Sequence, residues 1–250
     1  RIEKLYGFGR TLVRHGRVER GAEAYAKEAL QLAQSIGDQN GISNTFATLG
    51  MIAQASGKLD EAETAFGESY MHAMMIEQRG LMSRALFHLA DMARMRGDRT
   101  RATALAEEAL VNAQAIGMRW DIPIITTLLA HLASEQQNYP LATARYQEAL
   151  ALYRTFSSLA YTAGCLEGFA AALSAEGHYA QATRLCAAAA AALREQTQTP
   201  LPTAEREAFE QVIAAAKAAL GESIFTSAWT TGAALTHEEA IDYALSEACR

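Results

Sequence analysis

Residues 46–69 read FATLGMIAQASGKLDEAETAFGES, and this stretch decides the fold. Four residues of its first part share one helical face, namely Phe46, Leu49, Gly50 and Ala53. The turn that follows contains Gly57, a residue that can adopt the left-handed conformation in which many helices end. A second apolar face begins at Ala62, so the stretch predicts two helices joined by a short turn.

The same pattern recurs along the chain with a constant period, which equals the sequence separation between Ala22 and Ala62. Its clearest columns are Ala22, Ala62, Ala102, Ala142 and Ala182, then Glu28, Glu68, Glu108 and Glu148, and then Ile36, Ile76, Ile116 and Phe156. A further column holds only small residues, namely Gly9, Gly50, Ala90, Ala130 and Ala170. We expect small residues where the two helices of a hairpin cross most closely, because a larger side chain would separate them.

The composition agrees with an all-α protein. Half of the 250 residues are hydrophobic, four are proline, and the chain lacks the β-branched and aromatic runs that a sheet needs. The net charge of −6 argues against a nucleic-acid-binding surface, which is usually basic. No apolar run reaches the ~18 residues of a membrane span.

The cysteines and the start of the chain carry weaker information. Cys165, Cys186 and Cys249 show neither metal-ligand nor CxxC spacing, and scattered thiols suit a reducing cytoplasm. We expect no signal peptide and a cytoplasmic location. Because the chain begins without methionine inside a helical pattern, we expect it to be a piece of a longer protein.

The repeat pattern of Leu-Gly or Leu-Ala, a glycine turn and then alanine resembles the tetratricopeptide repeat over residues 1 to 195. The usual repeat has ~34 residues, and the longer period of this chain resembles the variant found in large bacterial signalling regulators. HEAT and armadillo arrays also have longer periods, but the glycine-turn-alanine signature favours the tetratricopeptide repeat. The resemblance implies an all-α, right-handed α-solenoid with hairpins at about 1–37, 40–77, 80–117, 120–157 and 160–195.

From residue 196 onward the period breaks, and residues 196–250 are expected to form a C-terminal helical cap. The expected segments are a turn at Pro200 and Pro202, a helix over 203–220 ended by Gly221, a short helix over 224–230, and a last helix from a capping box at 236–239 through Ala248. Such a cap would cover the last apolar face of the array.

This tail also resembles the C-terminal end of the repeat region in large ATP-binding transcriptional regulators of the LuxR type. The resemblance rests on Pro200-Leu201-Pro202, on Ala219-Leu220-Gly221-Glu222, on Phe225-x-x-Ala228-Trp229, and on the run from Ala234 to Leu245. In those regulators a nucleotide-binding switch domain precedes the repeats, and a helix-turn-helix domain often follows them. The present chain has no phosphate-binding loop motif, so the resemblance implies that it is the sensor or interaction arm.

In such arrays the first helix of each hairpin lines a concave groove where partners bind. The residues expected to face this groove are Tyr6, Arg10, Asn44, Met51, Gln54, Arg84, His88, Asp91, Arg94, Thr127, His131 and Glu167. Arg84 and Arg94 lie on one helical face and could pair with a carboxylate or phosphate of a ligand. The structural alternative, salt bridges among the groove residues themselves, is the commoner situation at a protein surface.

Four further groups suggest chemistry, and each has a plainer explanation. His88 and His131 could approach each other as metal ligands, but no further ligands can be placed, and ordinary polar residues are the simpler interpretation. The arginines around the Gly97 turn could dock an acidic surface or simply be solvated; they are Arg94, Arg96, Arg99 and Arg101. Six methionines could line an adaptable surface, although we expect them to fill the core between hairpins: Met71, Met74, Met75, Met82, Met92 and Met95. Cys165 lacks a convincing base and is not expected to be a nucleophile.

We therefore expect a binding region, not an enzyme, with no catalytic residue, no metal and no cofactor. Its groove would take a protein or peptide, or a small-molecule effector, without direct nucleic-acid or membrane contact. Binding would act on switch and DNA-binding domains outside this region. The alternative is a stand-alone adaptor that holds two proteins together.

Overall fold

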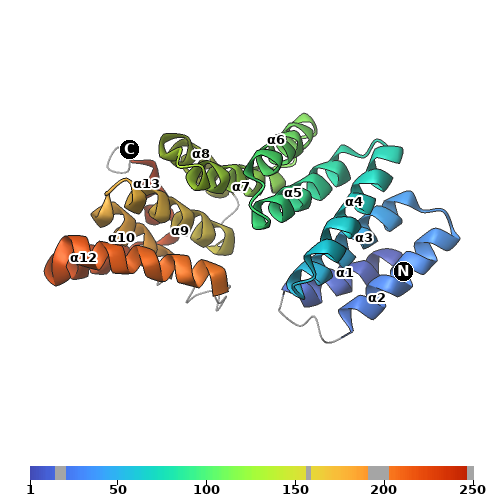
Figure 1. Cartoon of the computed structure of the whole chain (residues 1–250), viewed down its shortest axis with the longest axis horizontal. Coiled ribbons are helices and arrows are strands. Elements are labelled where there is room, and N and C mark those ends of the chain that lie inside the picture. The colour runs from blue at the N-terminus through green and yellow to red at the C-terminus, as the bar shows by residue number, and fades with distance from the viewer. Residues whose placement is uncertain (15–20, 156–158, 191–202, 247–250) are drawn as a thin grey trace. The chain divides into compact units, whose positions relative to one another are not determined.

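The computed structural model describes residues 1–14, 21–155, 159–190 and 203–246 (Figure 1). In these ranges it contains twelve α-helices and no β-strand, which confirms the all-α prediction. The first six are α1 (Ile2–Arg14), α2 (Ala22–Ser35), α3 (Gln39–Ala55), α4 (Leu59–Met75), α5 (Arg79–Met95) and α6 (Arg99–Ala115). The others are α7 (Asp121–Glu135), α8 (Tyr139–Tyr153), α9 (Leu159–Ala175), α10 (Tyr179–Ala187), α12 (Thr203–Ala233) and α13 (His237–Leu245). None of the described helices is both long and apolar enough to cross a membrane.

The turns between the helices repeat with half the sequence period. Helices α3 to α6 have 17 residues each, and turns such as 56–58 and 76–78 separate them, so these helices begin at the evenly spaced positions 39, 59, 79 and 99. One residue of each turn has a positive φ angle; these residues are Gly37, Gly57, Glu77, Gly97, Gly117, Gln137 and Gly177. At each such residue the chain leaves the helix. After α3, for example, the backbone N–H of Lys58 donates a hydrogen bond of 2.9 Å to the carbonyl oxygen of Ala53.

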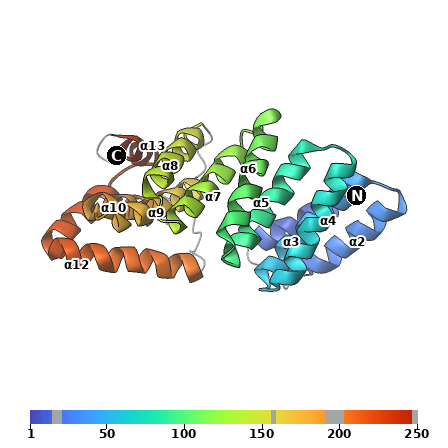
Figure 2. The same cartoon turned by 45° about the horizontal axis from the view of Figure 1, so that its top comes forward.

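The contacts divide the chain into two compact units, Arg1–Asp121 and Ile122–Arg250. In the first unit, each helix from α1 to α6 contacts the next, and α1 also contacts α3 (Figures 1 and 2). This unit is therefore a stack of three hairpins, α1–α2, α3–α4 and α5–α6, in chain order. In the second unit α9 contacts α8 and α10, while α12 contacts both α9 and α10, and α13 contacts α8.

The columns of small residues lie where helices meet, as predicted. The alanines of the strongest column are completely buried, namely Ala22, Ala62, Ala102, Ala142 and Ala182. At Gly50 the approach is closer still, because an added Cβ would lie 2.6 Å from Cε1 of the buried Phe66 ring. The period of the small residues in the sequence therefore reflects the positions where helices pack closely.

The tail confirms two local predictions and corrects two others. Thr236 and Glu239 form the predicted capping box at the start of α13. Gly221 breaks α12 with φ 72° and ψ 163°, as predicted for the end of the first tail helix. The segment after this kink continues to Ala233 instead of ending at residue 230, because Ala228 and Gly232 are buried as α12 packs on α10. The prediction that the last helix runs through Ala248 is wrong, because α13 ends at Leu245 and Ser246 has an extended backbone conformation.

Candidate functional site

Nine of the twelve predicted groove residues lie on the first helices of the Arg1–Asp121 unit. They are Tyr6 and Arg10 on α1, Asn44, Met51 and Gln54 on α3, and Arg84, His88, Asp91 and Arg94 on α5. We call the surface formed by α1, α3 and α5 the first-helix face. The contacts of α3 with both α1 and α5 bring the three helices side by side.

Three of these residues are joined across α3 and α5. The side-chain amide of Gln54 donates a hydrogen bond of 2.8 Å to Oδ2 of Asp91. The Arg94 guanidinium donates to Oδ1 of the same carboxylate, at 3.0 Å from its terminal nitrogen and 3.2 Å from Nε. We call Gln54, Asp91 and Arg94 the polar row. Their mutual bonds fix the side chains before any partner arrives, which lowers the entropy lost on binding.

The polar row remains within reach of solvent. The side chains of Asp91 and Arg94 are 22% and 33% exposed, so they are half-buried rather than sealed. Ion pairs at this depth contribute little net stability, about 0–1 kcal/mol for surface pairs. A carboxylate from a partner could therefore still reach the guanidinium of Arg94.

Arg84 has its own acidic neighbour. Its Nε lies 3.3 Å from Oδ1 of Asp121, the residue that begins α7, and the Arg84 side chain is 49% exposed. Both arginines that the sequence placed on the face of α5, Arg84 and Arg94, thus form ion pairs within the unit. Asp91 stands three residues before Arg94 on the same helix, whereas Asp121, the partner of Arg84, comes from α7 and no spacing rule could have identified it.

His88 belongs to the packing between hairpins. Its ring stacks on Phe66 with the centroids 4.5 Å apart and the planes 5° from parallel. Burial lowers the pKa of His88 to about 4, and the nearby Asp91 carboxylate offsets this only in part. The imidazole is therefore neutral near pH 7 and supplies an aromatic surface rather than a charge.

The remaining residues of the face are held by their neighbours. Tyr6 is buried, with the Arg10 guanidinium 5.7 Å from its ring centroid, and burial raises the pKa of the phenol. The Asn44 amide donates to the Asn40 side chain at 2.9 Å. Met51 packs against the buried cluster that contains Phe66.

The other three predicted residues lie in the Ile122–Arg250 unit. Thr127 donates to the Pro123 carbonyl at 2.8 Å. A ring nitrogen of His131 lies 2.9 Å from the Tyr146 hydroxyl of α8. Glu167 is half-buried on α9. These residues and the polar row belong to different units, so the structure does not join all twelve into one site.

The structure tests two of the other hypotheses, those on the arginine turn and on the methionines. Arg96 pairs with Asp60 and with Glu63, the latter at 3.1 Å, and Arg101 pairs with Glu63 at 2.8 Å, so part of the arginine turn is bound to α4. The expectation that the methionines fill the core is wrong for four of them, since Met71, Met74, Met75 and Met95 are exposed at the surface. Met92, by contrast, is buried. The exposed methionines lie toward the C-terminal ends of α4 and α5, on sides that no neighbouring hairpin covers.

Metal and thiol chemistry receive no structural support. Among the described residues, no group of three or more His, Cys, Asp or Glu side chains is placed to hold a metal ion. Cys165 and Cys186 are buried, and burial raises the pKa of the Cys165 thiol to about 12. A thiol with so high a pKa is protonated near pH 7 and is a poor nucleophile.

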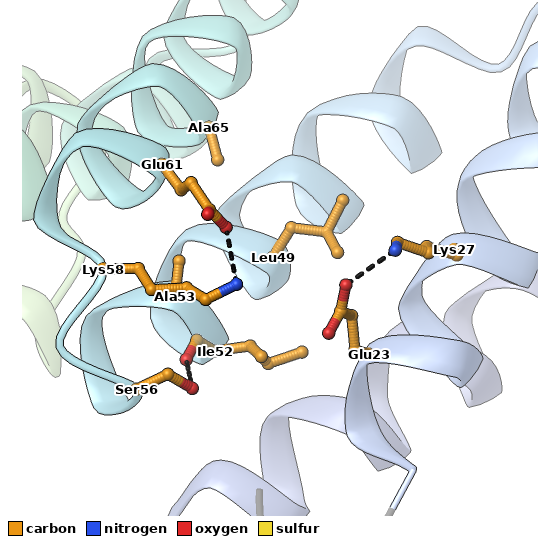
Figure 3. Close-up of a pocket in the computed structure, with 9 residues that line it drawn as sticks. All are labelled: Glu23, Lys27, Leu49, Ile52, Ala53, Ser56, Lys58, Glu61 and Ala65. Carbon is orange, nitrogen blue, oxygen red and sulfur yellow. Dashed lines mark hydrogen bonds and ion pairs between the residues drawn. The ribbon is translucent and has the colours of Figure 1, made fainter.

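A hollow that the sequence did not suggest lies between α2, α3 and α4 (Figure 3). It has a volume of about 240 Å³, and its lining residues are Glu23, Lys27, Leu49, Ile52, Ala53, Ser56, Lys58, Glu61 and Ala65. The ion pairs Glu23–Lys27 and Lys58–Glu61, at 2.6 and 3.2 Å, stand at its rim around an apolar floor. Pockets for drug-sized ligands are larger, ~300–1,000 Å³, so this hollow suits a single apolar side chain.

The origin of the hollow can be read from the repeat. Ala65 stands in the column that holds Tyr25 in the first hairpin and Leu105 in the third. A small residue in a column of large ones leaves space between α2 and α4. A comparison of side-chain volumes at equivalent positions of the repeats could therefore have predicted the hollow.

Comparisons with known proteins agree with the fold. No protein-family model matches the chain, and no curated protein matches it significantly. BtubC (BKLC) from P. vanneervenii has a similar structure, with a TM-score of 0.60 and 16% identity over 97% of this chain and 89% of that one. A candidate kinesin light chain of Podospora anserina, with nearly identical TPR-like repeats, has a TM-score of 0.55 and 14% identity over 89% of this chain and 98% of that one.

A third similar structure is a signal-transduction ATPase with numerous domains from Pyrococcus horikoshii, which has a tetratricopeptide repeat sensor. The TM-score is 0.54 and the identity 15%, over 92% of this chain but only 38% of that protein. At these identities the similarity concerns the fold alone. The chain has a tetratricopeptide-like repeat fold, and folds of this kind generally bind proteins or peptides.

Proposed function

We propose that the Arg1–Asp121 unit binds a peptide segment of a protein partner on its first-helix face. The observation that carries this proposal is the polar row, in which Gln54, Asp91 and Arg94 are fixed by one another and still partly exposed. A peptide offers backbone carbonyls and carboxylates, which are acceptors for the amide of Gln54 and the guanidinium of Arg94. Binding by such a surface requires no catalytic residue, so the function is recognition rather than turnover.

Peptide selection tests this proposal. A random peptide library is selected on the 250-residue chain, and the affinities of the selected peptides are then measured for the Arg94→Gln and Arg96→Gln variants. Arg94 belongs to the polar row, whereas Arg96 pairs with α4, so the two variants remove equal charge from different surfaces. We expect Arg94→Gln to weaken binding about tenfold, equivalent to about 1.4 kcal/mol, and Arg96→Gln to leave affinity nearly unchanged.

Equal sensitivity to both substitutions would show that net charge drives binding and would contradict a site at the polar row. A small-molecule effector would leave the selection without enriched peptides. Circular dichroism of both variants serves as the control for folding.

We further propose that this region is the sensor arm of a LuxR-type bacterial transcriptional regulator. Support comes from the tail, where the run from Ala234 to Leu245 resembles such regulators, and from the similar ATPase whose repeats are described as a sensor. A partner that binds better to one state of an attached switch domain would shift the equilibrium between its states, and a DNA-binding domain would transmit the change.

A stand-alone adaptor is the second candidate, favoured because the kinesin-light-chain-like structure is matched over 98% of its own length. The coding sequence on both sides of these residues separates the two candidates. A phosphate-binding loop before the repeats and a helix-turn-helix domain after them would support the sensor arm. A reading frame without either module would contradict the sensor arm and favour the adaptor.

A further inference from the structure

Within each unit, a hairpin presents one side to the hairpin that precedes it. On α3 this side contains Leu49 and Ile52, which pack with Leu12, Ala22 and Ala26 of hairpin α1–α2. On α5, Leu89 packs with Ala62 and Phe66 of hairpin α3–α4. In the second unit Phe169 of α9 stacks on Tyr146 of α8, with ring centroids 5.8 Å apart.

The same positions can be located on the first hairpin. The equivalence of Gly9 and Gly50 sets the register of α1 against α3, so Phe8 corresponds to Leu49 and Thr11 to Ile52. On the second helix, the equivalence of Ala22 and Ala102 makes Tyr25 correspond to Leu105. We call the resulting surface the N-terminal face, and it consists of Lys4, Gly7, Phe8, Thr11 and Tyr25.

The N-terminal face is uncovered in the part of the chain that the structure describes. Phe8 is 48% exposed, whereas its equivalents in two later hairpins, Leu89 and Phe169, are 9% and 0% exposed. Tyr25 is 39% exposed. A Cβ added at Gly7 would meet no atom within 4 Å. The two exposed rings contact each other edge to face, with centroids 4.9 Å apart, and so form one aromatic surface.

The later hairpins indicate what fits this surface. On α3 the equivalent leucine packs with Leu12 and with alanines of the preceding hairpin. On α5 and α9 the equivalent leucine or phenylalanine packs against an aromatic ring of the preceding hairpin, Phe66 or Tyr146. A second copy of this chain offers no such element, because its hairpins already cover one another and α12 lies against the last of them. The covering element is therefore a further hairpin, not an end of an identical molecule.

We propose that the N-terminal face is a docking surface for another α-helical hairpin of the same repeat type. This proposal is independent of peptide binding at the first-helix face, since none of its five residues belongs to the polar row. The docked hairpin would place an alanine column and an aromatic residue, equivalent to Ala62 and Phe66, over Phe8 and Tyr25. Burial of the aromatic pair would supply the favourable free energy.

The chain itself provides the probe. A copy of residues 39–81 is joined in front of Arg1, which brings Arg1 to the position that Met82 occupies after hairpin α3–α4. Hydrogen exchange of the α1 amides is compared between the original and the extended chain. We expect exchange in α1 to slow at least about tenfold in the extended chain, because a covered helix opens less often. Phe8→Ala should abolish this slowing, while its effect on the original chain should be small because Phe8 is half exposed there.

Two controls make the result specific. Gln31→Ala changes an exposed residue of α2 outside the N-terminal face and should leave the slowing intact. Phe66→Asp in the added copy should remove the slowing without altering the original residues. Unchanged α1 exchange in the extended chain would overturn the proposal. So would an original chain that light scattering shows to be a dimer and that Phe8→Ala converts to a monomer, because a second copy would then cover the face.

Discussion

The Asp91 carboxylate fixes two side chains of the first-helix face and also pairs with the arginine that a ligand would contact. It accepts hydrogen bonds from Gln54 and Arg94, so the guanidinium that seemed available to a ligand is already neutralised. Because the group is half-buried, the pairing is reversible rather than permanent. A partner's carboxylate would share Arg94 with Asp91, so only part of the free energy of that contact would appear as affinity.

His88 gives a prediction for the dependence of stability on pH. Its folded pKa of about 4 lies below the unfolded value of about 6.5, so the folded state favours the neutral ring. This contribution is present above pH 6.5 and is lost as the pH falls toward 4, because only the unfolded chain binds the proton in that interval. We expect the free energy of unfolding to fall by on the order of 1–3 kcal/mol from this group.

The measurement is urea unfolding between pH 7 and pH 4.5 for the original chain and for His88→Leu, which introduces the residue found at Leu128, the corresponding place of the fourth hairpin. Taking the difference removes other groups such as His237, whose pKa burial also lowers. A variant that loses stability as steeply as the original chain would show that His88 does not titrate in this range.

At the scale of the elements, the regularly spaced turns explain why helices α3 to α6 have equal lengths. A left-handed residue follows each helix from α2 to α7, and glycine occupies most of these positions because it lacks the Cβ that penalises this conformation. Glu77 and Gln137 are the exceptions, with φ angles of 50° and 60°. Their side chains gave no sign in the sequence that a turn residue stood there.

Replacing Glu77 by glycine should stabilise the protein. Relief of the left-handed strain, about 1–2 kcal/mol, exceeds the greater unfolded-state entropy of glycine, so we expect a net gain of about 0.5–1 kcal/mol. The matched control is Glu68→Gly in the interior of α4, where the backbone is helical and glycine should destabilise by about 0.5–1 kcal/mol. Thermal unfolding of both variants checks the prediction, and a loss of stability in Glu77→Gly would contradict it.

The elements also show what a sequence can and cannot convey about this fold. The column from Ala22 to Ala182 and the capping box at Thr236 and Glu239 depend on spacing within one or two helices, and the structure confirms both. The ion pair of Arg84 with Asp121 and the stacking of His88 on Phe66 depend on which helices meet, and spacing does not encode this. The groove assignment therefore stays a prediction, with its nine first-unit members now placed on known helices.

At the scale of the whole molecule, the two units should respond separately to damage. Contacts in a repeat array join neighbours, so a defect is felt mainly in the unit that contains it. Phe66 of the first unit and Phe169 of the second are both completely buried, and replacing either by alanine should cost about 3–5 kcal/mol.

Hydrogen exchange detected peptide by peptide measures this separation. Phe66→Ala should accelerate exchange in α3, α4 and α5 and leave α9 and α10 unchanged, and Phe169→Ala should do the reverse. Acceleration throughout the chain in both variants would show a single cooperative unit and contradict the division at Asp121. The sequence period continues across that residue without interruption, which is why the division could not be predicted.

The uniform turns have a consequence for how such a gene can change. Every turn between helices α3 to α6 has the same length and contains one residue in the left-handed conformation. A duplicated segment of one full repeat could therefore be inserted at any of these turns and still pack against a compatible neighbour on each side. Unequal crossing-over between copies could thus lengthen or shorten the protein without inventing a new junction. The kinked α12, which follows a different pattern, marks the end beyond which copies of this unit would no longer join.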